Sequence, residues 1–153
     1  MHARQLVLGL ALLGLAACGP SDEEMAAARQ EALRAARADS VAEAELIYDA
    51  TNFDSISWAH PDSAIARGTV VFRVSCRRCH GADGTGGGEL AVQHEIEMPD
   101  LTVVDWAYAD NIDALHHRIF VGHDSEMPNW GLHGLKYRDI DAVARYLLDE
   151  FRP

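Results

Sequence analysis

Two cysteines, a histidine and a run of glycines stand together in the stretch VSCRRCHGADGTGGGEL, residues 74–90. Cys76 and Cys79 are separated by two residues, and His80 follows directly. Side chains of these types at this spacing could hold a metal ion, form a redox-active dithiol, cradle a phosphate or attach a haem. The residues around them decide among these four kinds of site.

Three of the four kinds of site fit the surroundings poorly. A closed zinc site needs four ligands, and no suitably spaced pair of histidines follows the two cysteines. A redox dithiol needs its first cysteine at the start of a helix, whereas this motif comes at the end of a helix predicted over residues 62–76. A phosphate loop needs a strand before its glycines and a helix after them. Covalent haem attachment remains, with a plain structural disulfide as the alternative.

The N-terminus has the features of an export signal. Residues 1–17 read MHARQLVLGLALLGLAA, with an early arginine, a leucine-rich core and small residues at the end, and the apolar run is too short to span a membrane. The next residue completes LAAC, which resembles the lipobox of bacterial lipoproteins. That resemblance implies that Cys18 carries lipid and anchors the protein to a bacterial membrane, with the folded domain facing the periplasm or the cell exterior. An ordinary secreted protein, in which Cys18 has no such role, is the alternative.

Residues 18–60 are expected to form the lipidated cysteine and a helical or flexible spacer. Ser21 and Glu24 have the spacing of a capping box, and the alanine, glutamate and arginine that follow favour helix. Because the apolar side of this helix is mostly alanine, we expect it to be solvated, with a coiled-coil partner helix as the alternative.

The folded domain is expected over residues 61–153 and is predicted to be all-α. After the helix over residues 62–76, the pattern predicts helices over residues 110–122 and 137–151, the last with a clear apolar face, and no alternating strand. Two long loops, residues 81–105 and 122–136, lie between the helices, and loops of this length usually wrap something. We expect the glycines after His80 to let the backbone pass close to a bound ring.

Taken together, these motifs resemble class I c-type cytochromes over essentially the whole domain. Besides the CxxCHG motif, the resemblance rests on short segments spread along the domain: Gly68, Phe72, MPDLT at residues 98–102, IFVG at 119–122, MPNW at 127–130 and AVARYLL at 142–148. It implies a cytochrome c fold in which the N- and C-terminal helices of the domain cross, with Gly68 and Phe72 packed against Tyr146. It also implies loops that wrap one haem c, bound by thioethers to Cys76 and Cys79.

In the resemblance, His80 is the proximal axial ligand of the iron, and a methionine sulfur is the distal one. Met98 and Met127 both precede proline, so the local sequence does not separate them. Position in the family favours Met127, which lies between the middle helix and the last one. A second histidine as ligand is the alternative, and the candidates are His94, His116, His117, His123 and His133. We expect His116, on the apolar side of its helix, to be a core residue.

The charge excludes one class of partner. The formal charge is −11 and Lys136 is the single lysine, so nucleic acid is not an expected partner. We expect a monohaem electron carrier, not an enzyme, that passes single electrons between membrane respiratory complexes on the periplasmic side. Its redox partners would be a quinol-oxidising complex and a terminal oxidase or reductase. The alternatives are a permanently bound haem subunit of a larger oxidoreductase complex and, third, a gas-binding or peroxidase-like haem protein.

Overall fold

The computed structural model describes residues 19–125 and 127–151, and within these ranges every regular element is a helix. The elements are α1 (Asp22–Ile47), α2 (Thr51–Asp54), α3 (Pro61–Val71), the π-helical turn η1 (Phe72–Cys76), α4 (Arg77–His80), α5 (Glu89–Gln93), α6 (Ile112–Val121) and α7 (Tyr137–Glu150). The all-α prediction is confirmed. In the described part of the chain, no helix is both long and apolar enough to cross a membrane. The expectations for residues 1–18, including the lipidation of Cys18, lie outside the described residues.

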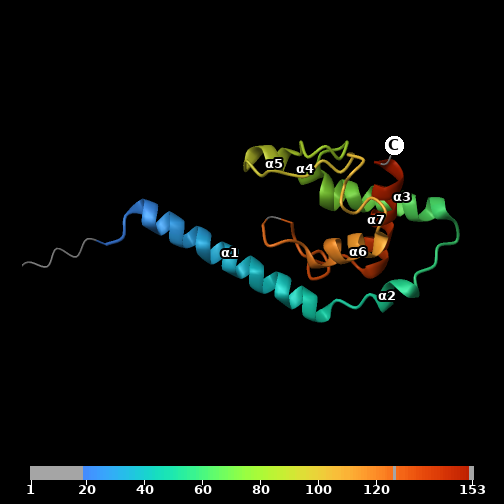
Figure 1. The fold of residues 1–153 in the computed structure, drawn as a ribbon, viewed down its shortest axis with the longest axis horizontal. Helices are drawn as coiled ribbons and strands as arrows, with labels where there is room; N and C mark the ends of the chain where they lie inside the picture. Colours follow the sequence, from blue (N-terminus) through green and yellow to red (C-terminus); the bar gives the residue numbers. More distant parts are fainter. Residues whose placement is uncertain (1–18, 126, 152–153) are drawn as a thin grey trace, which may run out of the picture.

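Helix α1 begins at the predicted capping box. The Ser21 hydroxyl accepts from the amide of Glu24, and the Glu24 carboxylate accepts from the amide of Ser21 at 2.7 Å. The first turns of α1 are exposed and extend away from the domain (Figure 1). Its last turns differ, because Ala44 is fully buried and Val41 and Tyr48 pack against the hydrophobic core. The segment expected to be a solvated spacer is therefore part of the folded domain at its C-terminal end.

Helices α3 and α7 pack against each other at Gly68 (Figure 1). A Cβ atom at this position would overlap the carbonyl oxygen of Ala142 and the Cβ of Tyr146, so only glycine lets the two helices approach this closely. One turn later, the ring centroid of Phe72 lies 5.4 Å from that of Tyr146. The expected packing of Gly68 and Phe72 against Tyr146 is confirmed.

Helix α6 packs on α7 and completes the core. The apolar face predicted for α7 is buried, and α6 contributes its own apolar residues from the other side. The buried side chains of these two helices include Leu115, Ile119, Phe120, Val121, Ile140, Val143, Ala144 and Leu147. Removal of this apolar surface from water is the main term that stabilises the domain. Helix α6 ends at Gly122, as predicted.

The α1–α3 link, residues 48–60, packs over a buried polar cluster. Phe53 of α2 stacks on His116 with ring centroids 3.9 Å apart. The indole N–H of Trp58 donates to the carboxylate of Asp141 at 2.6 Å, and Nε of Arg145 donates to the same carboxylate at 2.8 Å. Nε2 of His116 lies 3.2 Å from the other oxygen of Asp141. His116 is 3% exposed, which confirms its predicted place in the core.

Candidate functional site

The segment that carries Cys76, Cys79 and His80 is helical to its end. Helix α3 continues without a break into η1, and α4 extends the helical path to His80. The sequence pattern predicted an end near Cys76, so the helix is longer than expected. The turn η1 is wider than an α-helical turn, because the amide of Arg77 donates to the carbonyl of Phe72 five residues before it. Single π-helical turns of this kind are rare in proteins, and those that do occur often lie at functional sites.

Cys76 and Cys79 are not joined in a disulfide, and both side chains are half-buried. Burial, together with the neighbouring Cys79, raises the pKa of Cys76 to about 12. Disulfide exchange requires a thiolate, so the raised pKa of Cys76 disfavours a redox-active role for this thiol. Within the described ranges, no three His, Cys, Asp or Glu side chains are grouped so that they could hold a metal ion. The pair suits covalent attachment of a ring better than a zinc site or a redox dithiol.

His80 is the residue of the motif that fits an iron ligand. Burial lowers its pKa, so the ring is held in the neutral form that ligates metals. Its Nδ1 atom is buried and has no hydrogen-bond partner among the described residues. Buried polar atoms are rarely left unpaired in folded proteins. A haem bound at Cys76 and Cys79 would place a metal beside this imidazole, and the residues present fit that group.

The glycines after the motif fold back onto the motif itself. The amide of Gly86 donates to the carbonyl of His80 at 2.9 Å, and the amide of Gly88 donates to that of Cys79 at 3.1 Å. A Cβ at Gly88 would lie 2.5 Å from the Cys79 oxygen, so this position needs glycine. Gly88 makes room for the backbone of α4, and the expectation that the glycines also make room for a ring stays a prediction. Gly87 does face open space, with no atom within 4 Å of a Cβ built there.

Met127 lies in the loop between α6 and α7, residues 122–136, here named the Met127 loop. The amide of His123 donates to the carbonyl of Met127 at 3.0 Å and closes a tight turn. The side chain of Met127 is half-buried and packs against the hydrophobic core. Two further amides tie the loop to α6: Trp130 N–H to the Ile119 carbonyl at 3.3 Å, and Gly131 N–H to the Phe120 carbonyl at 3.0 Å.

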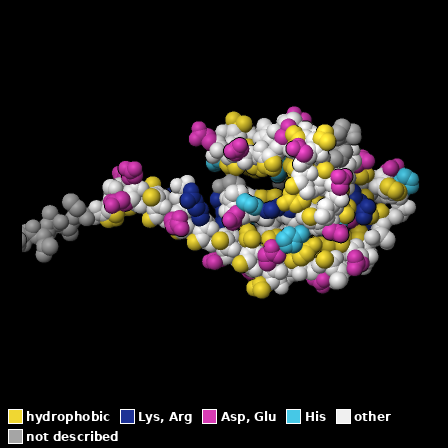
Figure 2. All heavy atoms as spheres, in the orientation of Figure 1, with side chains coloured by type: hydrophobic (Ala, Val, Ile, Leu, Met, Phe, Trp, Pro, Cys, Tyr) yellow, Lys and Arg dark blue, Asp and Glu magenta, His cyan; other side chains and the backbone are white. Residues whose placement is uncertain are grey.

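The second candidate methionine, Met98, lies on the side of the cysteine motif. A Cβ built on Gly86 would be 2.8 Å from the carbonyl oxygen of Met98, and the amide of Gly86 is bonded to His80. Figure 2 shows a hollow lined partly by hydrophobic side chains, between the α4–α5 region and the region of α6 and the Met127 loop. The Met127 loop and the α4–α5 region thus lie on opposite sides of this hollow, whereas the carbonyl of Met98 lies beside Gly86, whose amide is bonded to the carbonyl of His80. This arrangement favours Met127 over Met98 for the position opposite His80.

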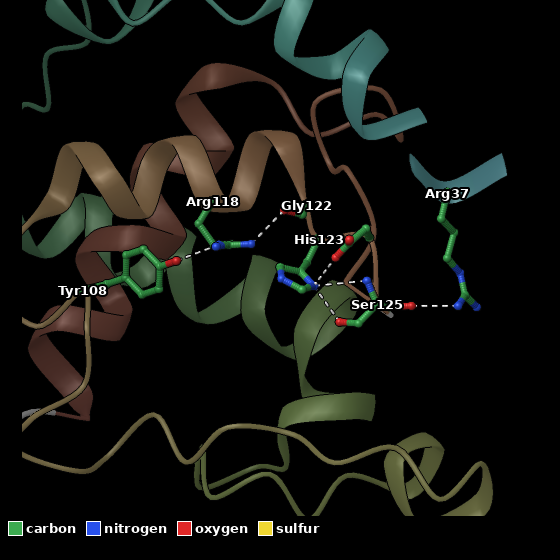
Figure 3. Close-up of polar contacts among 7 residues, drawn as sticks. Arg37, Tyr108, Arg118, Gly122, His123 and Ser125 are labelled. Atoms are coloured by element: carbon green, nitrogen blue, oxygen red, sulfur yellow. Dashed lines mark hydrogen bonds and ion pairs between the residues drawn. The ribbon is translucent and has the colours of Figure 1, made fainter. Parts of the chain in front are cut away.

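Arg118 is a residue at the site that the sequence reasoning missed. Its Nε donates to the hydroxyl of Tyr108 at 2.7 Å, and its Nη1 donates to the carbonyl of Gly122, the first residue of the Met127 loop, at 3.2 Å (Figure 3). The guanidinium is partly buried at the base of this loop. An arginine between the apolar residues Leu115 and Ile119 of one helix was the signal that could have identified it.

The other histidines have partners outside any common site. His117 lies 2.9 Å from the carboxylate of Glu45, and Nδ1 of His123 lies 2.6 Å from the hydroxyl of Ser125. Nδ1 of His133 lies 3.0 Å from the carbonyl of Asn129, and His94 is exposed. The polar contacts of His117, His123 and His133 are thus made with residues outside the cysteine motif.

Comparisons with known proteins identify a family and two relatives that this chain resembles. The family model described as cytochrome C oxidase, cbb3-type, subunit III matches residues 63–147, a range that includes both the cysteine motif and Met127. The cbb3-type cytochrome c oxidase subunit CcoP of Cereibacter sphaeroides is 32% identical over 93 residues, which are 60% of this chain and 30% of that protein. The subunit FixPc of Rhizobium leguminosarum bv. viciae is 33% identical over 92 residues, 53% of this chain and 29% of that protein. The chain thus spans less than a third of the length of each relative, and no solved structure matches it.

Proposed function

The chain belongs to the cytochrome c oxidase, cbb3-type, subunit III family, and we propose that its domain carries one covalently attached haem c and passes single electrons within a membrane-bound oxidase complex. The observation that carries this proposal is the buried Nδ1 atom of His80, which has no hydrogen-bond partner among the described residues and directly follows two cysteines that are not in a disulfide, Cys76 and Cys79. Haem iron would supply reversible one-electron oxidation and reduction. The chain supplies the attachment, the ligands and the enclosure.

Each residue of the site has a separate task in this proposal. Cys76 and Cys79 bind the ring through thioethers, His80 provides one axial ligand, and the sulfur of Met127 provides the other. A methionine opposite a histidine raises the reduction potential and fills the sixth position, which suits electron transfer rather than substrate binding. Arg118 holds the first residue of the Met127 loop through its bond to Gly122.

A bound oxidase subunit is better supported than the mobile carrier that the sequence analysis placed first. Both relatives are named as subunits of cbb3-type cytochrome c oxidases. In addition, the last turns of α1 are packed on the domain, so the segment between the N-terminus and the domain is not a loose tether along its whole length. A domain held at a fixed distance suits electron transfer within a complex.

The attachment to the membrane and the docking surface are parts of the same proposal. The LAAC sequence supports a lipid on Cys18 and a periplasmic or external location, and α1 begins shortly after it, at Asp22. Residues 61–153 contain 9 basic and 15 acidic residues, a formal charge of −6. Of the basic cluster Arg73, Arg77 and Arg78, the last is paired with Glu89 at 2.8 Å. We therefore expect the redox partner to present a basic or apolar surface.

The proposal is tested on the full chain produced in a bacterium that attaches haem c. A pyridine haemochrome spectrum should give one haem per chain that resists extraction by acidified acetone, and the double variant Cys76→Ala, Cys79→Ala should lose it. Detergent-solubilised membranes should then yield the chain together with oxidase subunits at high salt. Extractable haem in the parent chain would refute the attachment. Purification of the haem-loaded chain alone at every salt concentration would favour the mobile carrier instead.

A further inference from the structure

Helix α1 contacts the Met127 loop on both sides of Met127. Two residues before it, the carbonyl of Ser125 accepts a hydrogen bond from Nη1 of Arg37 at 2.7 Å (Figure 3). Two residues after it, Nδ2 of Asn129 donates to the carbonyl of Ser40 at 2.8 Å and also contacts the Ser40 hydroxyl. The helix expected to be a spacer therefore brackets the candidate iron ligand.

The contact at Asn129 is the stronger of the two. Asn129 is only 4% exposed although it lies in a loop. Water can therefore replace the Ser40 carbonyl as the acceptor of its side-chain N–H only when the loop opens locally. Leaving a buried N–H without an acceptor costs more than an ordinary hydrogen bond contributes. The bond from Arg37 reaches an exposed carbonyl and contributes less, because water competes for both groups.

The segment of α1 that makes these contacts is itself fixed to α6. Ala44 has no exposed surface. The ring of Tyr48, the residue that caps α1, meets that of Phe120 at a centroid distance of 5.3 Å, and the carboxylate of Glu45 lies 2.9 Å from Nε2 of His117. The Met127 loop starts from the end of the same helix α6. Helix α1 can therefore hold the loop at Ser125 and Asn129 against a fixed support, while α6 holds it at Gly122, Trp130 and Gly131.

We propose that α1 is a clasp that keeps the Met127 loop closed, with Arg37 and the carbonyl of Ser40 positioning Met127. That Met127 is an iron ligand rests on the proposed function, whereas the clasp rests on the contacts of the loop. Loss of the clasp raises the fraction of molecules in which the loop is open. An added ligand that binds iron only in the open molecules then gains apparent affinity in proportion to that fraction.

The first test uses the full haem-loaded chain and imidazole as the added ligand. Imidazole is titrated into the ferric protein while the methionine-sulfur-to-iron absorption band is followed. We expect roughly fivefold to tenfold tighter imidazole binding for Asn129→Ala, and about twofold for Arg37→Ala, from the hydrogen bonds lost. Arg29→Ala, on the exposed part of α1 two turns before Arg37, is the matched control and should bind imidazole as the parent chain does.

The second test does not depend on the iron. Amide hydrogen exchange over residues 123–131 is measured in the same four proteins, with far-UV circular dichroism to show equal helix content. The amides of His123 and Gly131, which are bonded within the loop and to α6, should exchange roughly fivefold faster in Asn129→Ala than in the parent chain or in Arg29→Ala.

Together, the two tests distinguish the clasp from the ligation of iron by Met127. If the parent chain shows no methionine–iron band, ligation by Met127 fails, and the exchange rates alone decide the clasp. If the band is present but neither imidazole affinity nor loop exchange changes in Asn129→Ala and Arg37→Ala, the clasp is refuted while the ligand stands. Changes in both readouts that are confined to these two variants support it.

Discussion

Asp141 of α7 accepts a hydrogen bond at 2.6 Å from the indole of Trp58, a residue 83 positions earlier in the chain. The carboxylate is 2% exposed and also contacts His116 and Arg145. Burial by itself would raise the pKa of Asp141, but the contacts with His116, Arg145 and Trp58 outweigh it and hold the pKa well below its usual range. This one carboxylate therefore ties α6, α7 and the α1–α3 link together.

The depressed pKa predicts how stability depends on pH. Because the folded state holds Asp141 ionised more strongly than the unfolded chain does, its contribution is complete above the ordinary carboxyl pKa of about 4 and is lost as the pH falls below it. Asp141→Asn should lower the free energy of unfolding by about 2 to 3 kcal/mol at pH 7. Urea denaturation measures the free energy of unfolding of both proteins from pH 7 to pH 3. The difference between Asp141→Asn and the parent chain should shrink as the pH falls. A difference that stays constant would contradict this role.

The crossing of α3 and α7 predicts a sharp response at Gly68. Gly68→Ala should destabilise the fold by about 2 to 3 kcal/mol, although alanine is the better helix former, because the new methyl group overlaps Ala142 and Tyr146. Thermal denaturation followed by circular dichroism measures the effect. Gly19→Ala, where nothing lies within 4 Å of the added group, is the control and should melt as the parent chain does. Equal melting of the Gly68→Ala variant would show that the helices do not approach so closely.

The charge of Arg118 predicts a change in reduction potential. A cation near the iron disfavours the oxidised form, so Arg118→Gln should lower the potential. Were the iron to lie about 10 Å from the guanidinium, the interaction at an effective dielectric constant of about 20 would be roughly 1.7 kcal/mol, which corresponds to some tens of millivolts.

Spectroelectrochemical titration of the haem-loaded chain measures this shift. Arg138→Gln is the matched control, because Arg138 is a surface residue whose guanidinium stacks over Trp58, 4.0 Å from the ring centroid. Its potential should stay within a few millivolts of the parent value, since an exposed charge is well screened. An unchanged or higher potential in Arg118→Gln would contradict the placement of this charge near the iron.

Much of the fold could be predicted because its signals are local or periodic. The apolar face of α7, the capping box at Ser21 and the end of α6 at Gly122 each depend on residues close together in sequence. The packing of Phe72 against Tyr146 was predicted from a resemblance rather than from a local pattern, and the structure agrees.

The features that were missed depend on partners far apart in the chain. The wide turn η1 and the extension to His80 leave no periodic signal, because a π-helical turn adds one residue to an otherwise regular helix. The alanines of α1 read as a solvated face, yet the small side chain of Ala44 is what allows close packing on the core. The bond from Asn129 to Ser40 joins residues 89 positions apart, which no single-sequence pattern shows.

The identity of the second axial ligand is the most direct test of the proposed site. The methionine-sulfur-to-ferric-iron absorption band is recorded for the haem-loaded parent chain, Met98→Ala and Met127→Ala at neutral pH. The Met127 loop lies across the hollow from α4, whereas Met98 lies beside the glycines that fold onto the motif, so the band should be present in the first two proteins and absent from the third. A Met127→Ala protein that keeps the band, or a Met98→Ala protein that loses it, would contradict the proposed site.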